Sequence, residues 1–130
     1  MGPVSSVAKV VRVRNEVRDS ILASNARVAD RLTSRLMGLM FSERLQNDGR
    51  DALLIEPCNS IHMCFMRYPI DVLFIDANDE IVGQVEDIKP WRVTKIYWNA
   101  RKALELPVGR IAETNTRVGD TLSIQPVVEA

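Results

Sequence analysis

The side chains with the widest chemical scope lie in one short stretch of the chain, residues 58–76. This stretch contains both cysteines and the only histidine, together with two methionines and a carboxylate that precedes an apolar run. Thiolate, imidazole and thioether groups are the ligands that soft metals such as Cu(I) prefer, and zinc binds through cysteine and histidine. The candidate residues for such chemistry are Cys58, His62, Cys64, Met66 and Asp71.

An extended backbone would place alternate side chains of this stretch on one face. His62 and Cys64 would then have Cα atoms about 6.6 Å apart, near enough to share a metal ion, whereas Cys58 and Met66 need a bend to join them. The other interpretation is structural, with His62 bonded to Asp71 or a carbonyl and the sulfur atoms packed as small hydrophobic groups. If the first interpretation holds, copper or zinc is the implied cofactor.

A cysteine nucleophile needs a base within hydrogen-bond reach of its thiolate. On one straight strand the Cα atoms of Cys58 and His62 would be about 13 Å apart, which is too far for a Cys58-dependent enzyme. A disulfide between Cys58 and Cys64 is also excluded on such a strand, because about 20 Å exceeds the roughly 7 Å limit for Cα atoms. Both cysteines are therefore predicted to be free thiols.

Two carboxylates are embedded in apolar sequence. Asp71 follows a proline and precedes an apolar strand, so it either orients His62 and contacts a ligand or caps the turn around Pro69. Glu105 stands between two leucines in an alternating strand, and we expect its side chain to face outward.

The composition is typical of a globular protein. Hydrophobic residues make up 46% of the 130 residues, and seventeen basic residues balance seventeen acidic ones. A neutral chain has no net field to attract nucleic acid or anionic lipid, so we expect neither partner. Residues 89–99 do mix basic and aromatic side chains, and we expect these rings to close the end of a β core. No apolar run reaches the roughly 18–20 residues of a membrane span, and no secretory signal is present, which predicts a cytoplasmic protein.

Short β-branched runs separated by turn residues dominate the chain. Besides the central stretch, strands are predicted at residues 7–14, 21–23, 52–56, 72–75, 81–85, 103–106 and 121–124. Apolar residues at spacings of three and four predict one helix over residues 28–41. The fold class is therefore mainly β, a compact antiparallel sandwich or small barrel of about eight short strands with one short helix. One domain spans residues 1–130, with N-terminal strands in 1–27 and a frayed tail at 126–130.

The order and spacing of several motifs resemble the Domain of Unknown Function 192 family. The motifs are Arg31-Leu-Thr-Ser-Arg-Leu-Met-Gly-Leu-Met40, Cys58-Asn-Ser-Ile-His62, Met66-Arg-Tyr-Pro-Ile-Asp-Val-Leu-Phe-Ile-Asp76, Lys89-Pro-Trp91, Leu104-Glu-Leu-Pro-Val-Gly109 and Gly119-Asp120. The resemblance covers about residues 28–125. It implies a mainly antiparallel β sandwich or barrel with a short helix, from a bacterial or archaeal source.

The resemblance also implies site residues. Family members share a histidine, a methionine and an aspartate that match His62, Met66 and Asp71, and many share a cysteine that matches Cys58. Position 64 is more often aromatic, so Cys64 departs from the pattern. The family has no established activity, so the resemblance implies a fold and a site but no reaction.

The primary hypothesis is a small β-rich domain that binds a small ligand or a partner through a pocket around His62, Met66 and Asp71. Cys58 and Trp91 are further candidate ligand-binding residues. The alternative is a soft-metal binding protein that uses copper or zinc, and the second alternative is a cysteine-dependent enzyme.

Overall fold

The computed structural model describes residues 9–30, 51–64 and 66–127. Its strands contain the β-branched runs of the sequence, although β2 is longer than its run. The strands and the helix are β1 (Val10–Asn15), β2 (Ser20–Ala29), β3 (Ala52–Ile55), β4 (Ile70–Ile75), β5 (Ile81–Ile88), β6 (Lys102–Pro107), α2 (Arg110–Glu113) and β7 (Leu122–Pro126). The predicted helix over residues 28–41 is wrong at residues 28 and 29, which belong to β2. Residues 31–41 lie outside the described part of the chain.

The seven strands form one sheet in the order β5-β4-β6-β3-β2-β1-β7. Neighbouring strands are antiparallel except β2 and β3, which are parallel. A parallel pair needs a long crossover, and residues 30–51 supply the chain length for it. The mainly β class with one short helix is confirmed among the described residues, with seven strands instead of about eight. The central stretch from Cys58 to Cys64 is a loop and supplies no strand.

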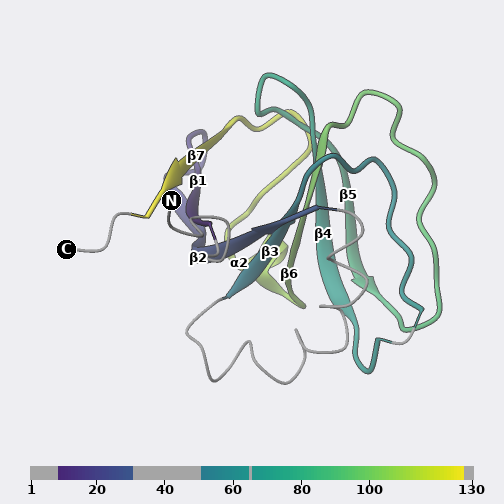
Figure 1. Cartoon of the computed structure of the whole chain (residues 1–130). Helices are drawn as coiled ribbons and strands as arrows, with labels where there is room; N and C mark the ends of the chain where they lie inside the picture. The colour runs from purple at the N-terminus through teal and green to yellow at the C-terminus, as the bar shows by residue number, and fades with distance from the viewer. Residues whose placement is uncertain (1–8, 31–50, 65, 128–130) are drawn as a thin grey trace, which may run out of the picture.

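The sheet curls into a half-barrel because its two edges meet at one end (Figure 1). The start of β5 is bonded to the start of β7: Glu80 and Thr121 form a β-bridge, and Ile81 N–H donates to Asp120 O at 2.9 Å. A buried polar group holds this junction together. The Asn15 side chain at the end of β1 donates to Thr116 Oγ1 at 3.1 Å and to Asp120 Oδ2 at 3.0 Å.

The Asp120 carboxylate has a lowered pKa. Burial alone would raise the pKa, but hydrogen bonds from Asn15, the Arg117 backbone N–H and Arg18, with the charge of Arg18, outweigh burial. Arg18 Nε lies 3.1 Å from Asp120 Oδ2. The carboxylate is thus held in its charged form where the edges of the half-barrel join.

Each face of the sheet packs a separate hydrophobic cluster. Side chains alternate along β4, so Leu73 and Ile75 enter the inner cluster while Ile70, Val72 and Phe74 enter the outer cluster. The inner cluster fills the half-barrel and includes Ile111 of α2. Within the ranges that the structure describes, loops and not a second sheet close the outer cluster.

Two segments, residues 57–64 and 89–101, cover the outer cluster; we call them the covering loops. They run side by side at the right of Figure 1, next to β4 and β5. Backbone hydrogen bonds join them at five places, donated by Cys58 N, Tyr97 N, Thr94 N, Met63 N and Trp91 N, at 2.7–3.0 Å. These bonds satisfy backbone groups that would otherwise be unpaired over an apolar face.

The covering loops are anchored to the sheet by an aromatic stack. The rings of Tyr97 and Phe74 have centroids 4.2 Å apart and planes inclined by 18°. Gly83 on β5 makes room for this stack, because a Cβ at position 83 would lie 2.2 Å from Tyr97 Cε1. No helix in the described ranges is long and apolar enough to cross a membrane.

Candidate functional site

His62 and Met66 lie on opposite sides of their loop. Ile61 and Met63 are buried, and His62 between them is exposed. The alternation then ends in a turn, in which Met66 N–H donates to Met63 O at 3.2 Å. This turn brings Met66 into the outer hydrophobic cluster while the imidazole faces solvent. The two side chains would share one face only on an extended backbone, and the turn between them removes that condition.

Asp71 lies on the other face of the sheet, almost completely buried at 1% exposure. Its Oδ1 accepts the Asp87 N–H at 2.9 Å, and its Oδ2 accepts the Gly109 and Ile111 N–H groups, each at 3.0 Å. The first bond fixes the irregular pairing between β4 and β5, and the other two hold the start of α2. The carboxylate neither orients His62 nor caps the turn at Pro69; it satisfies three backbone donors of other elements.

The predicted pocket shared by His62, Met66 and Asp71 is therefore not formed. The imidazole faces solvent, the thioether is packed in the outer cluster, and the carboxylate faces the inner side of β4. Binding of a ligand by any one of these residues stays a prediction, but no single hollow unites them.

Both cysteines are free thiols, as predicted. Cys58 is buried in the outer cluster and its Sγ donates to Ser60 O at 3.1 Å, whereas Cys64 is half-buried. Among the described residues, no three His, Cys, Asp or Glu side chains are placed to hold a metal ion together. The predicted copper or zinc set of His62, Cys58, Cys64 and Met66 thus has no geometric support in this part of the chain.

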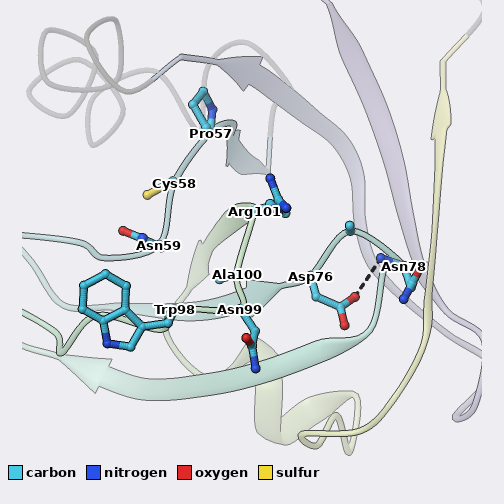
Figure 2. Close-up of a pocket in the computed structure, with 10 residues that line it drawn as sticks. Pro57, Cys58, Asn59, Asp76, Asn78, Trp98, Asn99, Ala100 and Arg101 are labelled. Carbon is cyan, nitrogen blue, oxygen red and sulfur yellow. Dashed lines mark hydrogen bonds between the residues drawn. The ribbon is translucent and has the colours of Figure 1, made fainter.

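A cleft of about 560 Å³ opens where the covering loops meet the end of β4. Figure 2 shows Trp98 and Asn59 on one side of the cleft and Asp76 and Asn78 on the other. Its lining residues are Pro57, Cys58, Asn59, Asp76, Ala77, Asn78, Trp98, Asn99, Ala100 and Arg101. Of the residues predicted from the sequence, the cleft includes Cys58 alone.

Polar side chains dominate the walls of this cleft. Three asparagine amides, which each donate and accept hydrogen bonds, stand beside the exposed guanidinium of Arg101. Asp76 is partly engaged, because its Oδ1 accepts the Asn78 and Glu80 N–H groups at 2.9 Å each. Trp98 is 80% exposed and offers a flat apolar surface at the rim. Sequence reasoning missed these residues because they converge from three loops without a common motif.

Glu105 is buried, contrary to the expectation that it faces outward. It lies on β6 opposite Leu53 and Val72, both of the outer cluster, and is 7% exposed. β6 is an inner strand covered on both faces, so its alternation has no solvent side. Burial raises the pKa of Glu105 to about 7, and the carboxyl has no hydrogen-bond or ion-pair partner within the described ranges.

Residues 89–99 contain three aromatic rings, and one of the three closes the core. Tyr97 stacks on Phe74, as expected for a core-closing ring. Trp91 and Trp98 are instead exposed, by 63% and 80%, so they do not close the core. Thr94, Tyr97 and Ala100 are the positions of the loop that face the sheet. Trp98 lies between two of these positions, whereas Trp91, three residues before Thr94, is exposed and has a positive φ of 68°.

These features define a class of protein: a small, mainly β domain built on one curled sheet, with two hydrogen-bonded loops over its outer face. Residues 13–124 match the family DUF192, described as "Uncharacterized ACR". The match covers most of the chain, and the chain belongs to this family, which confirms the resemblance found in the sequence.

Several archaeal proteins and two solved structures are similar to the chain. The UPF0127 protein of Pyrococcus horikoshii is 34% identical over 83% of this chain and 94% of its own length. That of Thermococcus sibiricus is 31% identical over 83% of this chain and 71% of its own length. A putative transcription regulator from Sinorhizobium meliloti superimposes with a TM-score of 0.71 at 22% identity, covering 95% of this chain and 98% of that one. A protein of unknown function from Novosphingobium aromaticivorans gives 0.70 at 18% identity, covering 95% and 90%. These structures support the fold.

Proposed function

We propose that this protein binds a small, hydrogen-bonding ligand with an anionic group in the cleft beside Cys58. The supporting observation is the cleft itself: about 560 Å³ lined by a guanidinium, three amides, an indole and the carboxylate of Asp76, whose Oδ1 already accepts two backbone N–H groups. Small-molecule sites are concave, have volumes of roughly 300–1,000 Å³ and use a few convergent polar groups for orientation.

Each wall of the cleft suits a different part of such a ligand. Arg101 has no ion-pair partner among the described residues and is suited to a carboxylate or phosphate, which guanidinium binds in two parallel hydrogen bonds. The amides of Asn59 and Asn99 would bond hydroxyl or carbonyl groups. Trp98 would cover a flat face of the ligand. His62, Met66, Asp71 and Trp91 have no place in this proposal because they do not line the cleft.

The test is a thermal-shift series with inorganic phosphate, citrate and a set of nucleoside monophosphates as probes. A probe that binds only the native state raises Tm, by an amount that corresponds to about 2.7 kcal/mol at a hundred times its Kd. The expected result is a Tm rise that Arg101→Gln and Trp98→Ala each reduce. Arg92→Gln is the matched control, since Arg92 is an exposed arginine of the same loop outside the cleft. The proposal is refuted if no probe raises Tm, or if Arg101→Gln responds like Arg92→Gln.

A further inference from the structure

The second covering loop, residues 89–101, divides its side chains sharply between the sheet and solvent. Thr94, Tyr97 and Ala100 face inward: Thr94 Oγ1 accepts the Ile61 N–H at 2.9 Å, Tyr97 stacks on Phe74, and Ala100 is buried. From Thr94 to Ala100 the inward positions recur every third residue. Residues 91–93, 95, 96, 98 and 99 are exposed, and in Figure 1 this loop forms the right-hand border of the molecule.

Large apolar side chains are concentrated on this outward side. They are Trp91 (63% exposed), Val93 (69%), Ile96 (45%) and Trp98 (80%). These four make up half of the eight exposed large hydrophobic residues in the described part of the chain. Both tryptophans of the protein are among them. Such a concentration marks an interaction surface, since scattered single residues are the usual pattern.

The same loop is strongly basic although the chain as a whole is neutral. Residues 89–104 contain five basic residues and no acidic residue. Two of the five are paired, Lys89 with Asp87 and Lys102 with Asp79. Arg92, Lys95 and Arg101 are exposed and have no ion pair with any residue that the structure describes. We call this outward side, with its four apolar and three basic residues, the basic-aromatic surface.

We propose that the basic-aromatic surface docks on an anionic lipid membrane as a peripheral contact. Tryptophan rings favour the boundary between headgroups and acyl chains. Transfer of the aliphatic side chains of Val93 and Ile96 from water to that boundary lowers the free energy. Each arginine or lysine near an anionic leaflet adds an attraction that screening by salt removes. The long side chains of Arg92 and Lys95 can keep their charges among the headgroups while their stems lie along the apolar residues.

The mixture of side chains favours lipid over single-stranded nucleic acid. Nucleic-acid surfaces of this kind stack bases on successive aromatic rings. Here two of the four apolar side chains, Val93 and Ile96, are aliphatic and offer no ring. The third ring of the loop, that of Tyr97, is occupied by its stack with Phe74.

The two tryptophans make the test direct, because the intrinsic fluorescence of the protein comes from the proposed surface. The full chain is mixed with vesicles of phosphatidylcholine alone or of equal parts phosphatidylcholine and phosphatidylglycerol. The expected result is a blue shift of emission and co-sedimentation with the anionic vesicles, both reversed by added salt. The proposal is overturned if neither signal appears with anionic vesicles at low salt. Binding of a single-stranded oligonucleotide without vesicle binding would overturn it in favour of a nucleic-acid surface.

A matched pair of double variants locates the contact. Arg92→Gln with Val93→Ser removes one charge and one aliphatic side chain from the surface, without touching a residue that lines the cleft. It should lower the partition coefficient at least about fivefold, the effect of one basic residue near an anionic surface. Arg117→Gln with Val118→Ser changes a second exposed Arg-Val pair, outside the basic-aromatic surface, and should leave partitioning unchanged. An equal fall of the partition coefficient in both double variants would refute the assignment of the membrane contact to the basic-aromatic surface. The cleft proposal is tested separately, by probe-induced changes in Tm.

Discussion

Replacement of Glu105 by glutamine should stabilise the protein at alkaline pH and leave it nearly unchanged at acidic pH. Glu105 is 7% exposed among apolar neighbours, and burial raises the pKa of its carboxyl from 4.5 to about 7. The folded state therefore keeps a proton that the unfolded chain releases near pH 4.5. Stability is full below that pH, decreases as the pH rises toward about 7, and is constant above it.

The magnitude follows from the size of the shift. A difference of about 2.5 pKa units corresponds to roughly 3 kcal/mol in the free energy of unfolding. About 2.5 kcal/mol of this loss falls between pH 5 and pH 8, because the unfolded carboxyl is already mostly ionised at pH 5. Glutamine has almost the same shape and no charge to desolvate, so Glu105→Gln should remove this pH dependence.

The assay is urea unfolding of both proteins at pH 5 and pH 8, followed by far-ultraviolet circular dichroism. Glu105→Gln should be more stable than the parent by roughly 2–3 kcal/mol at pH 8 and by less than about 1 kcal/mol at pH 5. Glu86→Gln, on the exposed part of β5, is the matched control. Its free energy of unfolding should equal that of the parent at both pH 5 and pH 8. A variant that is less stable than the parent at pH 8 would refute the reasoning, because it would mean that the ionised carboxylate has a stabilising partner.

Three further substitutions test the framework of the half-barrel. Asp71→Ala should lower the free energy of unfolding by roughly 3–5 kcal/mol, measured by urea titration, because three backbone N–H groups, one in a buried and two in partly buried hydrogen bonds, lose their acceptor; a loss below about 1 kcal/mol would contradict this role. Asp120→Asn should destabilise the protein at pH 7 more than at pH 3, because the lowered pKa of Asp120 gives a stabilisation that disappears as pH falls through that pKa; equal losses at both pH values would contradict it. Gly83→Ala should cost roughly 1–3 kcal/mol and weaken the near-ultraviolet dichroism of Tyr97, whose ring the new methyl group would displace; an unchanged spectrum would show that the ring adjusts freely.

The strands could be predicted because local patterns determine them. The apolar runs at residues 52–55 and 72–75 each predict a buried strand. The first run is β3 and is fully buried, and the second lies within β4. The parallel pairing of β2 with β3 could not be predicted in this way, since it depends on how residues 30–51 return the chain to the sheet. The fold class and most strand positions could thus be predicted, while the strand number was one too high for the described residues and the pairing order could not be predicted.

The candidate site could not be predicted where an unsignalled local turn or a contact between distant residues determines the position of a side chain. The alternation from His62 to Met66 is interrupted by a turn that contains neither glycine nor proline, so the sequence carries no signal for it. Asp71 finds its partners at Asp87, Gly109 and Ile111, far along the chain. Glu105 looks like an outward residue until β6 is known to lie inside the sheet. Cys58 was the one predicted residue that the cleft contains.

Nuclear magnetic resonance of the two tryptophan indole N–H groups would test the cleft most directly. Trp98 lines the cleft and Trp91 does not, and they are the only two tryptophans of the chain. When a probe that raises Tm is titrated into the protein, the Trp98 resonance should move in proportion to occupancy while the Trp91 resonance stays in place. A titration that moves Trp91 alone, or neither resonance, would contradict ligand binding in this cleft.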